Sequence, residues 1–387
     1  MDVDNPAHNY LQRLQNEAPS GLAQYFLEFE DLYERKLWHQ LTKRVEEFIN
    51  ISEAAPYRIG LYNEFVKDWQ KHMNKVKLVL FALAAARQFD DVSEAAEFMA
   101  KIAERVSSTT PETSQQEEAY VLALLESAHF KLQLNDLDAT REILDSCQKK
   151  VESFTVVDPV IYASFYRVCA DYYKAKASFG QYYKNALLLL ACIDIQELST
   201  DDRSQRAYDL CIAALLSDNI YNFGDLLSHP ILDSLKGTEH EWMVELLFAF
   251  NSGDIAKYET MAASLNSQPL LKQQQSMLQQ KIRLMALIES MFKRQGAGTR
   301  MVPFNAVAAE TKMPVNDIEH LVMKALSLGL IRGSIDQVDK QITVQWVQPR
   351  YLGKEQIRNL VDRLAQWESQ VKNTAQKMSQ TAPELFA

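Results

Sequence analysis

The chain of 387 residues is poor in the residues that interrupt helices, with 11 glycines and 11 prolines. This scarcity favours long helices over a fold of many short strands. Cysteine is also scarce, with 4 residues and no C-x-x-C pair. Zinc and redox sites need tighter clustering, so we expect buried, reduced thiols of a cytosolic or nuclear protein. These cysteines are Cys147, Cys169, Cys192 and Cys211.

Long apolar runs are missing as well. The two longest, residues 78–86 and 186–193, are shorter than the roughly 20 residues that a membrane-spanning helix needs. The acidic start, Met1-Asp2-Val3-Asp4, has no hydrophobic run. We therefore expect neither a membrane segment nor a secretory signal. With 47% hydrophobic and 24% charged residues, the composition is otherwise that of a globular protein with a sizeable core.

Sequence signatures of catalysis are absent. The chain has no G-x-x-x-x-G-K-[ST] phosphate loop, no H-E-x-x-H or H-x-H pair and no G-x-S-x-G turn. Its 7 histidines are scattered along the chain, so a metal site would require the tertiary fold to bring them together. We therefore expect no catalytic residue, no cofactor and no metal, and an enzyme is the least supported class of protein.

The net charge of −10 is unevenly distributed. Residues 281–350 contain 10 Lys and Arg against 6 Asp and Glu, so the acidic excess lies in the first 280 residues. An acidic body disfavours general nucleic-acid binding, which depends on neutralising phosphates. The basic balance of the later segment leaves nucleic-acid binding open there.

The first 280 residues contain one amphipathic helix pattern after another. Val121, Leu124, Leu125 and Ala128, for example, follow the spacing of a single buried helix face. Short polar breaks separate these patterns at residues 135–136, 178–180, 218–219 and 252–254. Their spacing of about 35–43 residues is the size of a helix–turn–helix repeat. One such pair cannot cover its own apolar face, so the pairs should stack into a right-handed solenoid.

Two local features refine this expectation. Asp158 followed by Pro159 predicts an N-cap and a proline at the first helical position. Residues 107–118, SSTTPETSQQEE, are of low complexity and predict an exposed loop between two helix pairs. A phosphorylation site in this loop is the alternative to a plain solvated linker.

After residue 281 the pattern changes to the element order of a winged helix. In the last strand-like run Ile342, Val344 and Trp346 alternate with polar residues, as in a half-buried strand. Gly329 is expected to end the helix before the strands as a C-cap. The expected elements are a helix ending at residue 294, a short apolar piece at 301–304, helices at 305–311 and 314–328, and strands at 330–335 and 341–347.

A winged helix has two common uses. In the first, a recognition helix reads DNA, but helix 314–328 offers Asp317 and Glu319 against Lys324, and two carboxylates repel phosphate. The basic residues lie outside that helix, at Lys293, Arg294, Arg300, Lys312 and Arg332. In the second use, unpaired backbone groups at a sheet edge accept a strand from another chain. We favour the second use.

Residues 354–378 predict one long terminal helix. Ile357, Leu364, Val371 and Met378 repeat every seven residues, which is the spacing of a helix that packs on other helices. The alternative is that this helix folds back on its own chain. With the strand residues, the candidate protein interface comprises Ile342, Val344, Trp346, Ile357, Leu360, Leu364, Trp367 and Val371.

A helical stack followed by a winged helix resembles the PCI-domain proteins, which build the proteasome lid, the signalosome and a translation-initiation complex. Residues 29–38, 207–235, 281–292, 317–338 and 343–349 are similar to a PCI-domain subunit of the 26S proteasome regulatory-particle lid. The resemblance covers nearly the whole chain and is strongest from residue 205 to 350. The sequence of residues 221–230, YNFGDLLSHP, favours the proteasome over the other two complexes.

The resemblance implies a mostly α protein in four parts. These are an N-terminal helical-repeat solenoid (1–204), the last helical repeats of the PCI domain (205–280), a winged-helix subdomain (281–350), and a C-terminal bundle helix and tail (351–387). It also implies a non-catalytic scaffold subunit that supports ubiquitin-dependent protein degradation in the cytoplasm and nucleus. The lid's deubiquitinating activity belongs to a metalloprotease subunit with an H-x-H motif, which this chain lacks.

The implied partners are the other PCI and MPN subunits of the lid. The winged helix would join those of its neighbours side by side, and the terminal helix would enter a shared helix bundle. The N-terminal solenoid would lie near the ubiquitin receptor of the regulatory particle. The alternatives are a subunit of the signalosome or of the initiation complex, and a nucleic-acid-binding PCI protein.

Overall fold

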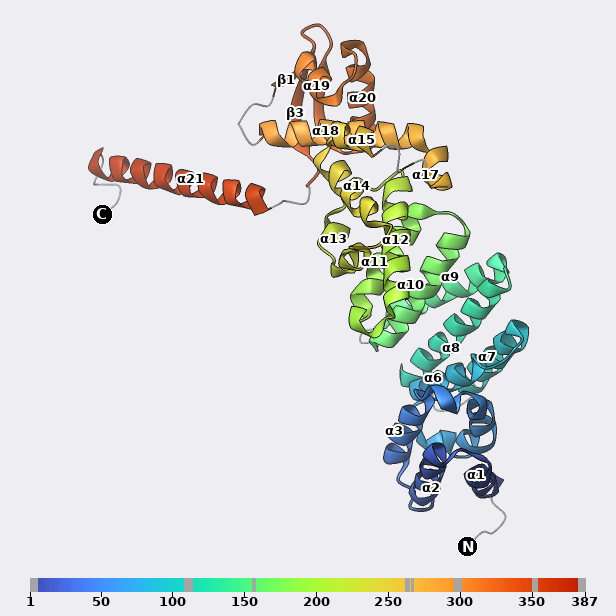
Figure 1. The fold of residues 1–387 in the computed structure, drawn as a ribbon. Helices are drawn as coiled ribbons and strands as arrows, with labels where there is room; N and C mark the ends of the chain where they lie inside the picture. The colour runs from blue at the N-terminus through green and yellow to red at the C-terminus, as the bar shows by residue number, and fades with distance from the viewer. Residues whose placement is uncertain are drawn as a thin grey trace. The chain divides into compact units, whose positions relative to one another are not determined.

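The computed structural model describes residues 6–107, 114–154, 158–261, 265, 268–295, 301–349 and 354–381. These residues are mostly helical (Figure 1). The chain divides into two compact units, Met1–Glu197 and Leu198–Ala387. The boundary expected after residue 204 falls inside helix α12 (Thr200–Leu216).

The first unit is built from helices that pack as sequential neighbours. The main helices are α1 (Pro6–Glu17), α2 (Ser20–Glu34), α3 (Trp38–Ile49), α6 (Lys75–Ala86), α7 (Val92–Ser107), α8 (Ser114–Gln133), α9 (Leu137–Ser153), α10 (Pro159–Ala175) and α11 (Phe179–Cys192). Shorter pieces are η1 (Ser52–Tyr57), α4 (Arg58–Gly60), η2 (Leu61–Val66), α5 (Lys67–Trp69), η3 (Gln70–His72) and η4 (Ile195–Glu197). Helix α1 packs on α2, α7 on α8, and α10 on α11, as expected for helical repeats.

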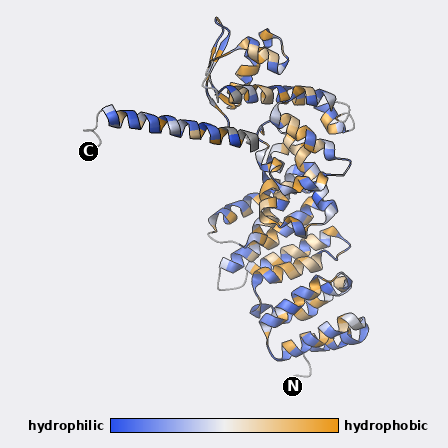
Figure 2. Ribbon diagram, turned by 60° about the vertical axis from the view of Figure 1, so that its left-hand side comes forward, coloured by the Kyte–Doolittle hydropathy of each residue, from blue (hydrophilic) through white to orange (hydrophobic). Residues whose placement is uncertain are grey.

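The predicted start at Asp158 and the break at residues 135–136 are confirmed, whereas the break predicted at 178–180 ends at Ser178 because Phe179 and Gly180 belong to α11. The Asp158 carboxylate accepts the backbone N–H of Val160 at 3.2 Å, and Pro159 is the first residue of α10. Asp136 caps α9 in the same way, by accepting the N–H of Ala139. Hydrophobic residues recur along the stacked helices of this unit (Figure 2). They form one continuous core, in which Phe26, Phe29 and Phe48 are fully buried and in ring contact with one another.

The loop predicted over residues 107–118 is wrong in its second half. Helix α8 begins at Ser114, and Gln116 is buried. The Gln116 side-chain amide donates a 2.7 Å hydrogen bond to the carbonyl oxygen of Val106 at the end of α7. The bond pairs the buried amide of Gln116, which the low-complexity composition had predicted to be exposed to solvent. Residues 108–113 lie outside the described residues.

The second unit begins with further helices and continues into the winged helix. The first group comprises α12, α13 (Gly224–Leu227), η5 (Pro230–Leu235), α14 (Glu241–Ser252), α15 (Ile255–Thr260), α17 (Pro269–Gln273) and α18 (Gln275–Gln295). The second comprises β1 (Met301–Pro303), α19 (Phe304–Thr311), α20 (Val315–Ser327), β2 (Ile331–Asp336), β3 (Gln341–Val347) and α21 (Lys354–Thr381). The predicted order of helices and strands in the winged helix and the terminal helix is confirmed, with ends that shift by at most three residues.

One glycine fixes the contact between α14 and α18. Gly253 ends α14 with φ +67°, and a Cβ atom at this position would lie 2.6 Å from the Cα of Ala286 in α18. Backbone cannot move aside as a flexible side chain can. The two helices can therefore pack this closely because residue 253 has no side chain.

The sheet has three antiparallel strands in the order β1-β3-β2. Helices α18, α19 and α20 pack with one another and against these strands. Their shared core includes Val302, Val307, Ile318, Val322, Ile331, Ile342 and Val344. A small helical core capped by a short sheet is the expected winged-helix module.

Candidate assembly interface

The burial pattern of β3 departs from the predicted alternation. Ile342 and Val344 are buried, but Trp346 is 37% exposed and Val347 is buried in its place. The reason is a β-bulge, because Arg332 pairs with Trp346 whereas the next residue, Gly333, pairs with Val344. The extra residue in β3 shifts every later side chain to the opposite face.

The position of β3 also corrects the expected edge. Strand β3 lies between β1 and β2, so its backbone is paired on both sides where the three strands overlap. Ile342 and Val344 therefore face the module's own core and are not contact residues of an edge strand. Among the described strands, β1 and β2 are each paired on one side. Strand β2 is the longer of the two, which makes it the edge that a neighbouring strand could better join.

The bulge leaves an exposed aromatic residue on the wing. The Arg332 guanidinium lies 5.0 Å from the centre of the Trp346 ring, within the range of a cation–π contact. Val338, at the turn between β2 and β3, is 92% exposed. We call Arg332, Val338 and Trp346 the wing face. Trp and Arg are the residues that most often dominate protein–protein interfaces.

Three basic residues of the module, Arg294, Lys312 and Lys324, have polar partners within the chain. Arg294 pairs with Glu310 at 2.5 Å, and Lys312 pairs with Glu259 at 2.8 Å. The Lys324 ammonium donates a hydrogen bond to the Gln280 side chain. These contacts reduce the charge available for phosphate and weaken the nucleic-acid hypothesis. Arg300 lies outside the described residues.

Helix α21 displays the predicted apolar ridge on its surface. The exposed fraction is 47% for Ile357, 54% for Leu364 and 65% for Trp367. Val361, which the heptad count omits, is 57% exposed beside them. We define the apolar ridge as Ile357, Leu360, Val361, Leu364, Trp367, Val371 and Met378. Polar residues dominate the rest of the helix, as the colouring in Figure 2 shows.

The ridge has the dimensions of a helix-bundle contact. From Ile357 to Met378 it extends over about 32 Å at 1.5 Å per residue. All side chains described in α21 are exposed, so the alternative that this helix folds back on its own chain has no support among them. A lone amphipathic helix gains most of its stability from packing on other helices, so we expect the ridge to require a partner.

A buried lysine that the sequence pattern does not single out joins α18 to α12. Lys281 is 2% exposed. Its ammonium donates to the carbonyl oxygens of Ala214, Leu215 and Ser217 at 2.7, 3.1 and 2.6 Å. These carbonyls belong to the last turn of α12 and the residue after it, where positive charge is favoured. Burial lowers the pKa of Lys281 to about 7.

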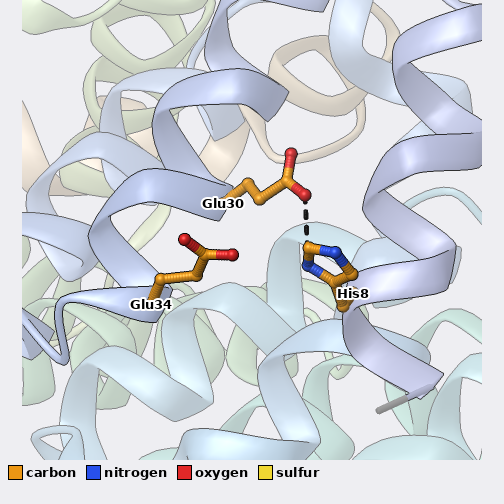
Figure 3. Close-up of side chains that lie close together, drawn as sticks. All are labelled: His8, Glu30 and Glu34. Carbon is orange, nitrogen blue, oxygen red and sulfur yellow. Dashed lines mark ion pairs between the residues drawn. The ribbon is translucent and has the colours of Figure 1, made fainter. Parts of the chain in front are cut away.

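The fold brings three metal-type ligands together in the first unit. His8 of α1 lies beside Glu30 and Glu34 of α2, and the three side chains point toward one another (Figure 3). His8 Nδ1 lies 3.1 Å from Glu30 Oε1, and the Gln15 amide donates to the other Glu30 oxygen at 2.6 Å. An interhelical ion pair accounts for these contacts. The sequence search could not find this group because 22 residues separate His8 from Glu30.

No described helix is long and apolar enough to cross a membrane. The stacked helices and the winged helix define the class, a PCI-domain protein, and residues 256–346 match the PCI domain family. Residues 25–247 match the family of PSD13 N-terminal repeats. The chain belongs to the family of 26S proteasome non-ATPase regulatory subunit 13, whose fungal members are named rpn9.

Similar proteins support this assignment along the whole chain. The 26S proteasome non-ATPase regulatory subunit 13 homolog B of Arabidopsis thaliana is 39% identical, with 98% of this chain and 99% of the relative covered. The probable 26S proteasome regulatory subunit rpn9 of Schizosaccharomyces pombe is 38% identical, with 98% of this chain and 97% of the relative covered. Eukaryotic translation initiation factor 3 subunit M of Coccidioides immitis is 25% identical over 53% of this chain and 43% of the relative.

Proposed function

We propose that the chain is a non-catalytic scaffold subunit of the proteasome regulatory-particle lid, where it supports ubiquitin-dependent protein degradation in the cytoplasm and nucleus. One observation carries the proposal: a helix of 28 residues presents an apolar ridge to solvent, in a chain similar over 98% of its length to 26S proteasome regulatory subunits. A ridge of this kind requires other helices, and a multisubunit complex supplies them.

The ridge would enter a bundle formed with the C-terminal helices of other lid subunits. Its seven side chains are each about half exposed. Covering what remains of them would contribute roughly 1 kcal/mol each before the cost of association. That is enough to make α21 a principal anchor in the complex.

The wing face would form the second joint. Neighbouring PCI subunits would pair along β2 and contact Trp346, and the MPN subunits would lie against the same assembly. The first unit would lie near the ubiquitin receptor of the regulatory particle. No catalytic residue is assigned, which agrees with relatives named as non-ATPase regulatory subunits.

Native mass spectrometry of the tagged chain purified from cells tests this function. We expect co-purification with the other lid subunits at one copy each. Recovery with signalosome or initiation-factor subunits would assign the fold to another complex, as the partial similarity to initiation factor 3 subunit M allows. Recovery of the chain alone, with no partner subunits, would contradict the scaffold role.

A further inference from the structure

A surface pocket of the first unit is lined by basic side chains and by no carboxylate. Its volume is about 630 Å³, and the turn before α3, the start of α3, and the segment from η3 into α6 form its walls. The basic residues of the lining are Lys36, His39, Lys43, His72 and Lys77. This charge is unusual because the acidic excess of the chain lies in the part of the sequence that contains the pocket.

Two of the three lysine ammonium groups in the lining, those of Lys36 and Lys43, are available to a partner. Lys36, His39 and Lys43 are exposed, and no ion pair among the described residues involves them. Lys77 is the exception, because its ammonium lies 2.7 Å from Glu46. The neighbouring pocket between α2 and α3, which shares Lys43, differs in that it contains Glu28, Asp31 and Glu47. Of these two neighbouring pockets, only the first has a lining of basic residues without a carboxylate.

Apolar surface lies beside the charges. Leu37 is 38% exposed at the pocket wall. The Trp38 ring stacks on His72 at 5.1 Å and on the buried Trp69 at 6.0 Å, which holds this wall rigid. Side chains held by packing keep a binding surface in place without an entropic cost at the moment of binding.

We propose that this pocket binds an acidic peptide segment of a partner protein, whose carboxylates lie against Lys36 and Lys43 and whose apolar side chain lies against Leu37. Complementary charge is the argument for the carboxylates. The first turn of α3, which has no side-chain cap, belongs to the same lining, and positive helix-dipole charge at a helix start favours carboxylates. The net charge of −10 repels acidic chains at long range, so binding there requires local contacts.

Two other anionic partners fit the pocket less well. A polyphosphate has no apolar group to place against Leu37. A nucleic acid would stack its bases on aromatic rings, but the Trp38 ring is already stacked on His72 and Trp69. A nucleic acid also carries its phosphates along an extended backbone, and the five basic residues of this pocket would contact only a short stretch of it. An acidic peptide can place carboxylates against the lysines and an apolar side chain against Leu37.

Fluorescence anisotropy on the full chain tests the proposal. The probe is a fluorescein-labelled peptide of alternating Asp-Glu pairs and single leucines, compared with the same peptide carrying Asn and Gln. The double variant Lys36→Gln, Lys43→Gln removes two charges from the pocket. The control, Lys149→Gln with Lys176→Gln, removes two exposed charges from α9 and from the end of α10.

The pocket variant should bind the acidic peptide about tenfold more weakly than the wild type, because two contacts between opposite charges are lost. The control should change the affinity less than about twofold, and the amide peptide should not bind. The proposal would be overturned if both variants lost affinity equally or if the acidic peptide did not bind. It would also be overturned if single-stranded DNA or tripolyphosphate bound the same pocket at least as tightly as the peptide.

Discussion

The ammonium of Lys281 lies 2.6 Å from the carbonyl oxygen of Ser217, and two further carbonyls of α12 accept its remaining N–H groups. The side chain of one helix thus completes the hydrogen bonds at the end of another. Because α18 continues into the winged-helix module, this contact links the last helical repeats to that module within the second unit.

Replacing Lys281 by methionine should destabilise the second unit. Lys281→Met keeps much of the apolar stem but leaves three carbonyl oxygens without their donor, at a cost of about 2–4 kcal/mol. Urea denaturation followed by circular dichroism measures the change. Lys272→Met, at an exposed position of α17, is the control and should stay within about 0.5 kcal/mol. Equal stability of the two variants would show that the Lys281 contacts contribute little.

The same residue predicts a dependence of stability on pH. Burial lowers the pKa of Lys281 from 10.5 to about 7, so between these values the unfolded chain binds more protons than the folded chain. The free energy of unfolding should therefore rise with pH, by at most about 1.4 kcal/mol per unit. The readout is the difference between wild type and Lys281→Met from pH 7 to about 8.5. A difference that stays constant over this range would contradict the lowered pKa.

Alanine substitutions at two glycines distinguish the stability cost of backbone strain from that of steric overlap. Both Gly253 and Gly237 have positive φ, at +67° and +75°, but a Cβ atom at Gly237 would meet nothing within 4 Å. Gly237→Ala should cost about 1 kcal/mol through strain alone. Gly253→Ala adds a clash with the Ala286 backbone and should cost about 2–4 kcal/mol. Thermal unfolding of both variants checks this, and similar losses would mean that α14 and α18 separate easily.

The helices could be predicted because the sequence signals that place them lie within a few neighbouring residues. The break at Asn135-Asp136, the cap at Asp158 and the apolar stripe of α21 each depend on residues a few positions apart. A helical period and a capping residue suffice to place such elements. The exception is Gln116, which is helical and buried because its amide reaches Val106 on the preceding helix.

The interface was harder to predict because it depends on strand order and register. Alternation placed Trp346 on the same face as Val344, and a single bulge opposite Gly333 reverses that assignment. The central position of β3 follows from pairing with β1, nearly forty residues earlier in the chain. Lys281 shows the same limit, since its buried position depends on α12 and cannot be read from its own helix.

The exposed Trp346 gives a direct test of the wing face. Trp346→Ala should leave the isolated chain folded, because the side chain is 37% exposed, and should weaken incorporation into the lid. Met323→Ala, 52% exposed on α20, is the control outside the wing face and should assemble normally. Cross-linking yields between this chain and its neighbours measure the effect. Unchanged yields for Trp346→Ala would remove the wing face from the interface.

The most direct test of the scaffold role replaces two residues of the apolar ridge. Leu364→Glu with Trp367→Glu places two charges on the ridge, whereas Gln366→Glu with Ser369→Glu adds the same charge to another face of α21. Native mass spectrometry of each tagged full-length variant purified from cells should find the ridge variant folded but alone, and the control within the lid. Equal incorporation of the two variants would contradict the claim that α21 joins this chain to its complex.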